Sequence, residues 1–209
     1  PYDMPLHAAC QAGSMEAACF LLDRGAAINS RNEFGITPLM RACIAGRVEV
    51  VSMLLGRGAD PAAVSSQSWT ALMLASGEIK RQGAGYVEII RLLLKDGRGR
   101  VDARNMYGFT ALWLACFWGN AEEARVLLLE GRADHTIPNN EGVTPMGAAK
   151  QGNYGECARL LKVRERIGHA LEGRFFPFPP RSTSNNMPPT TNALLSVLLS
   201  CSGSRASSR

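Results

Sequence analysis

The sequence predicts an all-α repeat fold, in which one small unit is stacked several times and a disordered tail follows. The first observation is a short phrase that recurs as Thr37-Pro38-Leu39, Thr70-Ala71-Leu72, Thr110-Ala111-Leu112 and Thr144-Pro145-Met146, with Met4-Pro5-Leu6 as its opening version. Successive phrases begin 33, 33, 40 and 34 residues apart. The second observation is that a glycine and then an apolar run follow each phrase. A period near 33 residues is typical of a solenoid, so we look for function on a surface and not in a pocket.

A first helix is expected to begin directly after the opening residue of each phrase. A threonine hydroxyl, such as that of Thr37, caps the first turn by accepting a backbone N–H. Pro38 at the next position loses no hydrogen bond, because a backbone N–H at the first position of a helix has no partner within the helix. Small pairs such as Ala42-Cys43 then allow the helix to lie close to its neighbours, and so they set the stacking distance.

A turn, a second helix and an extended loop complete each unit. Gly46 permits the left-handed backbone geometry that ends one short helix before another starts. The apolar run Val50–Leu55 forms the second helix, and Gly58 ends it in the same way before an extended finger. Because a pair of helices of roughly ten residues each is marginal in water, the core arises from the stacking of neighbouring units.

Four features together closely resemble the ankyrin repeat: the phrase, the mid-unit glycine, the apolar run, and the sequence Gly58-Ala59-Asp60 at the end of the second helix. The resemblance implies five units of helix, turn, helix and finger, at about residues 1–33, 34–66, 67–106, 107–140 and 141–172. These units form one ankyrin-type solenoid domain, residues 1–172, and a Pro- and Ser-rich basic tail, residues 173–209, follows it. The resemblance specifies the fold closely and the function poorly, because ankyrin stacks serve many partners.

The third unit carries six extra residues between Ala75 and Gly85, in the turn that joins its two helices. Two interpretations of this insertion stand side by side. Glu78, Lys80 and Arg81 belong to a solvated bulge, which is the usual outcome of a turn insertion, or they widen the binding surface at one point.

Charge and hydropathy argue against nucleic acid as a partner and against a membrane span. The net charge is +5, but the tail holds four arginines and no acidic residue, whereas the rest of the chain holds 19 basic and 18 acidic residues. A duplex-binding face needs basic side chains gathered on one surface, and the stack is almost neutral. No segment approaches the roughly 18 apolar residues that would predict a membrane span.

The cysteines are predicted to be core residues and not metal ligands or disulfides. Cys10, Cys43 and Cys116 occupy equivalent positions in three first helices, and Cys19 and Cys157 lie in second helices. The sequence has no CxxC pair, and cysteine is among the residues most often buried. Reduced thiols in a stacked core indicate a cytoplasmic location, with the nucleus as the alternative.

The tail is predicted to be extended chain without a packed core. The segment Phe175–Pro180 is rich in proline, and Ser, Thr, Asn and Pro dominate the residues after it. The apolar island Ala193–Leu199 is far too short to span a bilayer. It forms a turn or two of helix on a partner or on the last repeat, or it belongs to a tail that has no partner.

No catalytic activity is predicted for this chain. The three histidines, His7, His135 and His169, lie in different settings, and no nucleophile, base and orienting group share one predicted site. The stretch Gly83–Gly85 lacks the third glycine of a dinucleotide loop, and no GK[ST] phosphate loop is present. We therefore expect neither a cofactor, nor a metal, nor a small-molecule substrate.

The resemblance implies that partners bind to the fingers and to the last residues of each first helix. Large apolar and aromatic residues at these positions concentrate in the third and fourth units. The partner-binding residues predicted in this way are Phe34, Trp69, Met106, Tyr107, Phe109, Phe117 and Trp118. Phe117 and Trp118 have a second interpretation, in which they cover the insertion of the third unit. Trp113 is expected to pack internally.

The sequence therefore predicts a non-catalytic protein-interaction module or adaptor that binds a protein partner. One alternative is the targeting or regulatory segment of a larger enzyme, of kinase or ubiquitin ligase type, whose catalytic domain lies outside this chain. The full-length gene would distinguish the two. A chromatin- or nucleic-acid-associated protein has less support, and a strong salt dependence of binding would be its mark.

Overall fold

The computed structural model describes residues 4–77 and 85–172 of the 209-residue chain. Within them lie ten α-helices: α1 (Pro5–Ala12), α2 (Met15–Asp23), α3 (Pro38–Ile44), α4 (Val48–Gly56), α5 (Ala71–Ser76), α6 (Gly85–Asp96), α7 (Ala111–Trp118), α8 (Ala121–Leu129), α9 (Pro145–Gln151) and α10 (Gly155–Glu172). The predicted tail with its apolar island, and most of the insertion after Ala75, lie outside the described residues.

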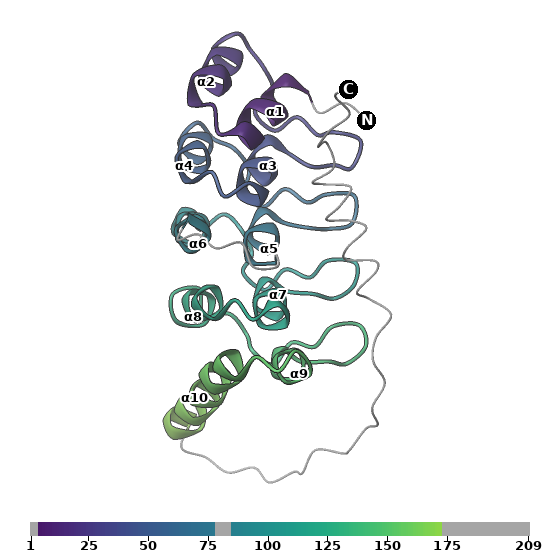
Figure 1. The fold of residues 1–209 in the computed structure, drawn as a ribbon, viewed down its shortest axis with the longest axis vertical. Coiled ribbons are helices and arrows are strands. Elements are labelled where there is room, and N and C mark those ends of the chain that lie inside the picture. Colours follow the sequence, from purple (N-terminus) through teal and green to yellow (C-terminus); the bar gives the residue numbers. More distant parts are fainter. Residues whose placement is uncertain (1–3, 78–84, 173–209) are drawn as a thin grey trace, which may run out of the picture. The chain divides into compact units, whose positions relative to one another are not determined.

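The helices form two columns, which are visible side by side in Figure 1. The inner column contains the first helices, in which α1 contacts α3, α3 contacts α5, α5 contacts α7 and α7 contacts α9. The outer column contains the second helices, from α2 to α10, and each first helix also packs on the second helix of its own unit. An all-α repeat solenoid, as predicted, is therefore the observed fold.

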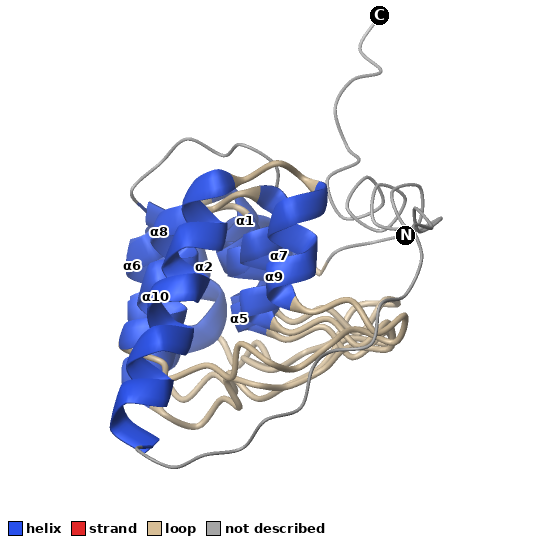
Figure 2. Ribbon diagram, turned by 90° about the horizontal axis from the view of Figure 1, so that it is seen from below, coloured by secondary structure: helices blue, strands red, loops and turns tan. Residues whose placement is uncertain are grey.

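Four extended loops connect successive units, and we name them finger A (residues 26–36), finger B (59–69), finger C (99–109) and finger D (133–143). Figure 2 shows these loops projecting together to one side of the helices. Each finger enters the first helix of the next unit through a capping threonine. The fingers therefore lie beside the inner column, as Figure 1 also shows.

The threonine caps are confirmed. The side-chain oxygen of each threonine accepts the backbone N–H three residues later, as predicted for the first turn of a helix. The four bonds are Thr37 to Met40 (3.3 Å), Thr70 to Met73 (3.2 Å), Thr110 to Trp113 (3.1 Å) and Thr144 to Gly147 (3.2 Å). Met4 has no such oxygen, and α1 begins without a side-chain cap.

The turn after the first helix follows the prediction in three units and departs from it in the fifth. Gly46 has φ of +66°, and Gly13 and Gly119 are left-handed as well. In the fifth unit Gly152 has φ of −79°, so the expectation of a left-handed glycine is wrong there. Asn153 adopts the left-handed conformation instead, with φ of +57°. Asparagine tolerates this geometry better than most residues, because its short polar side chain bonds locally.

The core runs between the two columns and is built mainly from small and aliphatic side chains, with Trp69, Phe109 and Trp113 as large aromatic members. Cys10, Cys43, Cys116 and Cys157 are buried, which confirms them as core residues, whereas Cys19 is only half-buried. Burial raises the pKa of the Cys10 thiol to about 12, because a thiolate loses its hydration there. Burial raises the pKa of the Cys43 thiol as well, so Cys10 and Cys43 behave as small apolar groups, and not as reactive nucleophiles.

Candidate functional site

The tip of each finger has the same turn, held by one side-chain oxygen. Asn105 Oδ1 accepts the backbone N–H groups of Tyr107 (3.0 Å) and Phe109 (2.9 Å). Asn32 in finger A and Asn139 in finger D make the same pair of bonds, and the hydroxyl of Ser65 does so in finger B. These two bonds constrain the backbone of the residues at the tip.

Neighbouring fingers are joined at their tips by one backbone hydrogen bond each. Ser66 N donates to Phe34 O at 2.9 Å, Met106 N to Gln67 O at 3.2 Å, and Asn140 N to Tyr107 O at 3.0 Å. The tips therefore form a continuous rib along the stack. Equivalent tip positions are occupied by Phe34, Gln67, Tyr107 and Glu141, so the side chains of the rib change from one unit to the next.

Three of the predicted finger residues are accessible to solvent, and two are buried. Phe34 is 43% exposed, Met106 is 54% exposed and Tyr107 is half-buried. Trp69 and Phe109 are 2% and 1% exposed, so the expectation that they contact a partner is wrong.

The reason is the position of Trp69 and Phe109 within the finger. Their carbonyls accept the backbone N–H of Ser65 (2.9 Å) and Asn105 (3.1 Å), which closes the tip turn. Both residues stand directly before the capping threonine, at the base of the finger. Ile36, at the same position in finger A, is 3% exposed. This position serves the core, although it lies only two residues beyond the tip.

An aromatic ladder runs along the fourth unit from finger C to the end of α7. Its ring centroids are 5.7 Å apart for Tyr107–Phe109, 4.1 Å for Phe109–Trp113, 5.0 Å for Trp113–Phe117 and 4.8 Å for Phe117–Trp118. Trp113 and Phe117 are four residues apart on α7, so their rings lie on one face of the helix, and Phe109 stacks on Trp113 from the end of finger C. Phe109 and Trp113 are buried, whereas Tyr107, Phe117 and Trp118 are half-buried.

Trp113 has a structural role, as predicted. It is 1% exposed, and its indole Nε1 donates to Val143 O at 2.9 Å. At the equivalent position of the first unit, His7 Nε2 lies 2.9 Å from Ile36 O. Both rings thus bond the last residue of the following finger, so Trp113 makes in the fourth unit the contact that His7 makes in the first.

Phe117 and Trp118 are half-buried at the C-terminal end of α7, directly before the left-handed Gly119. Their rings meet edge to face, with an interplanar angle of 78°. The insertion that they were expected to cover lies largely outside the described residues. Of the predicted partner-binding residues, Phe34, Met106, Tyr107, Phe117 and Trp118 keep solvent-facing area. We call this candidate set the concave patch, after the concave face on which the resemblance to the ankyrin repeat places partner binding.

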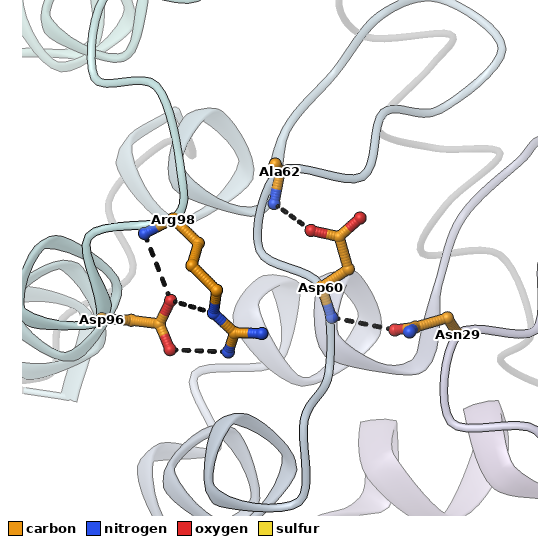
Figure 3. A network of polar contacts seen from close by, with 5 residues as sticks. All are labelled: Asn29, Asp60, Ala62, Asp96 and Arg98. Carbon is orange, nitrogen blue, oxygen red and sulfur yellow. Dashed lines mark hydrogen bonds and ion pairs between the residues drawn. The ribbon is translucent and has the colours of Figure 1, made fainter.

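Charged groups are paired mainly away from the concave patch, near the outer helices. Arg57 pairs with Asp23 at 2.5 Å and Arg91 with Glu130 at 3.0 Å, and both pairs link neighbouring units. After α6, two nitrogens of the Arg98 guanidinium donate to the Asp96 carboxylate at 2.7 Å each (Figure 3). This bond holds the pKa of the Asp96 carboxyl below its usual range.

Sites for metals and membranes were sought in the described part of the chain. Among residues 4–77 and 85–172, no three His, Cys, Asp or Glu side chains are grouped so that they would hold a metal ion. Over the same residues, no helix is long and apolar enough to cross a bilayer.

One family model matches the chain, and its description is "Ankyrin repeats (3 copies)". It matches residues 6–105, 55–138 and 82–169, three overlapping segments that together cover most of the chain. The repeated units, threonine caps and fingers described above lie inside these segments. Ankyrin repeats are generally modules for protein–protein interaction. The chain belongs to the ankyrin repeat family.

Proposed function

We propose that this stack binds a protein partner through the concave patch: Phe34, Met106 and Tyr107 on the fingers, and Phe117 and Trp118 at the end of α7. The observation that carries the proposal is the exposure of the large apolar side chains of Phe34 and Met106 at the fingertips. Met106 is 54% exposed, although a single turn and two interfinger bonds hold its backbone in place.

These side chains are expected to contribute more to the free energy of binding than the surface ion pairs do. Burying an apolar side chain of this size gives about 1.5 to 3 kcal/mol. An exposed ion pair gives about 0 to 1 kcal/mol, because water already solvates both charges. Interface hot spots are also enriched in tryptophan and tyrosine. Two such residues would dominate the affinity of a partner of ordinary interface size.

The fixed geometry of the fingers helps for a second reason. Binding costs less when the contacting side chains are already held in place, because little backbone freedom is lost. The side-chain bonds of Asn105 and the backbone bonds between tips provide this order before a partner arrives. We therefore expect recognition without a large rearrangement of the stack.

The experiment uses a double variant that carries both Phe34→Ala and Met106→Ala. Its matched control is the single variant Phe20→Ala. Phe20 is 56% exposed, but it lies on α2 in the outer column. Proteins captured from a cell extract by the unaltered stack are identified by mass spectrometry, and each is then titrated against purified variants. We expect the fingertip variant to weaken binding by about 100-fold or more, while Phe20→Ala binds normally. Normal binding by the fingertip variant, with an unchanged circular dichroism spectrum, would remove the concave patch as the site.

A further inference from the structure

Two of the three junctions between neighbouring fingers are bridged by a side-chain oxygen. At junction A–B, Asn29 Oδ1 accepts the backbone N–H of Asp60 at 2.9 Å (Figure 3). At junction C–D, Asp102 Oδ1 accepts the backbone N–H of Asp134 at 3.0 Å. Asn29 and Asp102 occupy the same position, eight residues before the capping threonine of their finger. An oxygen at this position therefore ties one finger to the next.

An arginine clamps the same two junctions. The Arg31 guanidinium donates to Val64 O across junction A–B. At junction C–D, Arg104 Nη2 donates to Asn140 Oδ1 at 3.0 Å. Arg31 and Arg104 are again equivalent, six residues before the capping threonine.

A left-handed glycine allows the next finger to approach at both junctions. A Cβ atom on Gly35 would lie 2.8 Å from Ser66 N, and one on Gly108 would lie 2.6 Å from Asn140 N. Real Cβ atoms do not approach backbone nitrogens so closely. The absence of a side chain is therefore part of the close packing between fingers.

Junction B–C has none of these three features. The equivalent residues of finger B are Ala62, which has no acceptor, Val64, which has no cation, and Ser68, which carries a Cβ at φ of +62°. The tip bond at this junction, Met106 N to Gln67 O, is 3.2 Å long, against 2.9 and 3.0 Å at the other two. Fingers B and C are consequently held together less closely than their neighbours.

A cleft of about 410 Å³ lies at this junction. Its walls include the three exceptional residues Ala62, Val64 and Ser68 on finger B, and Arg100, Asp102 and Arg104 on finger C. Val64 is 40% exposed there. The cleft thus occupies the space that a side-chain bridge and an arginine clamp fill at the other two junctions.

We propose that this cleft binds an acidic side chain of a peptide segment in a partner protein. At the other junctions, an oxygen meets the backbone N–H of Asp60 or Asp134. The equivalent amide here belongs to Arg100, and the bridging position of finger B is occupied by Ala62, whose side chain has no acceptor. A carboxylate from the partner supplies the missing oxygen, and Val64 packs against the methylene groups beside it.

The charges around the cleft select an acidic ligand over a basic one. Arg100 and Arg104 contribute two positive charges, and Asp102 contributes one negative charge whose Oδ1 already accepts a bond from finger D. A guanidinium or ammonium group would be repelled by the two arginines. A carboxylate forms charge-assisted hydrogen bonds with guanidinium groups, which are about twice as strong as neutral ones. This site is separate from the concave patch.

The test is an NMR titration of the 15N-labelled chain with three blocked pentapeptides, which carry Glu, Gln or Lys between Gly-Ala and Ala-Gly. We expect the Glu peptide to shift the Arg100 amide signal in a saturable manner. The Gln peptide should bind about tenfold more weakly, because its amide forms neutral hydrogen bonds only. The Lys peptide should not shift this signal. Equal affinity for the Glu and Gln peptides, or tighter binding of the Lys peptide, would overturn the proposal.

Two variants close the cleft in different ways. Ala62→Asn supplies the oxygen found at Asn29, and Val64→Arg supplies the clamp found at Arg31. Each should weaken binding of the Glu peptide at least about tenfold, since the peptide then competes with an internal group. If one variant fails to fold, the other still decides. Unchanged affinity in a folded variant refutes the site.

Two further controls distinguish the cleft from a general attraction of anions and from the concave patch. Sodium phosphate alone should shift the Arg100 amide only at far higher concentration, and an equal response would indicate attraction of any small anion, against the proposal. The double variant Phe34→Ala with Met106→Ala should bind the Glu peptide normally. If this variant loses the protein partner but binds the Glu peptide normally, both proposals stand. If the unaltered chain binds the protein partner but does not bind the Glu peptide, only the cleft is rejected.

Discussion

Replacing Gly108 by alanine should separate the cost of backbone strain from the cost of contact between fingers. Gly108 has φ of +79° and Gly142 has φ of +80°, so both favour glycine equally. A Cβ on Gly108 would lie 2.5 Å from Asn140 Oδ1 and 2.6 Å from Asn140 N, whereas a Cβ on Gly142 would meet no atom within 4 Å. The two positions therefore form a matched pair that differs only in the neighbouring finger.

The expected losses of unfolding free energy differ by about a factor of two. A left-handed alanine costs about 1 to 2 kcal/mol relative to glycine, which is the whole effect expected for Gly142→Ala. In Gly108→Ala, finger D must also move away. Asn140 then loses its bonds to Tyr107 O (3.0 Å) and Met106 O (2.8 Å), at about 1 kcal/mol each. The total for Gly108→Ala is about 3 to 4 kcal/mol.

The assay is urea unfolding of both variants, followed by circular dichroism at fixed pH and salt. The slope of free energy against urea concentration should stay the same, because the same surface is exposed on unfolding. Equal losses in the two variants would show that the contact between fingers C and D contributes nothing measurable. The difference in stability that we infer between bridged and unbridged junctions would then be contradicted as well.

The structure also predicts the direction of three further changes in stability. Ser68→Gly should stabilise the chain by about 1 kcal/mol in the same assay, because it relieves a left-handed serine at φ of +62°; destabilisation would contradict the strain. Thr110→Ala should cost about 1 kcal/mol, through loss of the cap to Trp113 N at 3.1 Å, and Thr110→Ser should restore most of it. The hydrogen bonds from Arg98 lower the pKa of the Asp96 carboxyl in the folded chain. The stabilisation that these bonds give is therefore present above about pH 4, and it is lost as the pH falls through the lowered pKa. Unfolding measured from pH 6 to pH 2 should therefore show a smaller acid loss for Asp96→Asn than for the unaltered chain.

The sequence predicts the helices well because their signals are local. Thr37 and Thr144 cap helices whose first residue is a proline, and a period of about 33 residues repeats that signal. Asn153 shows where such reasoning fails. The glycine before it matched the pattern, but the turn places its left-handed residue one position later. A pattern of residue types specifies that a turn exists more reliably than which residue takes the unusual φ.

The candidate site is harder to predict, because neighbouring residues of a finger face different surroundings. Tyr107 and Phe109 are separated by one residue and belong to one aromatic ladder. Tyr107 keeps exposed area at the tip, while Phe109 closes the turn and is buried. Side-chain type gives the same hydrophobic signal for both. The difference depends on the backbone bond from Asn105 N to Phe109 O, which only the folded finger reveals.

In a solenoid, stability is approximately a sum of unit terms and of interfaces between nearest neighbours. A side chain that only bridges two fingers can therefore be removed at one junction without disturbing the others. Asn29 and Asp102 keep their bridges on either side of Ala62, and the helices of the third and fourth units still pack on one another. The missing bridge leaves a backbone amide and an arginine-lined cleft at the surface. Irregularity at a junction thus removes a local contact, and it leaves groups at the surface that a perfectly regular stack would pair internally.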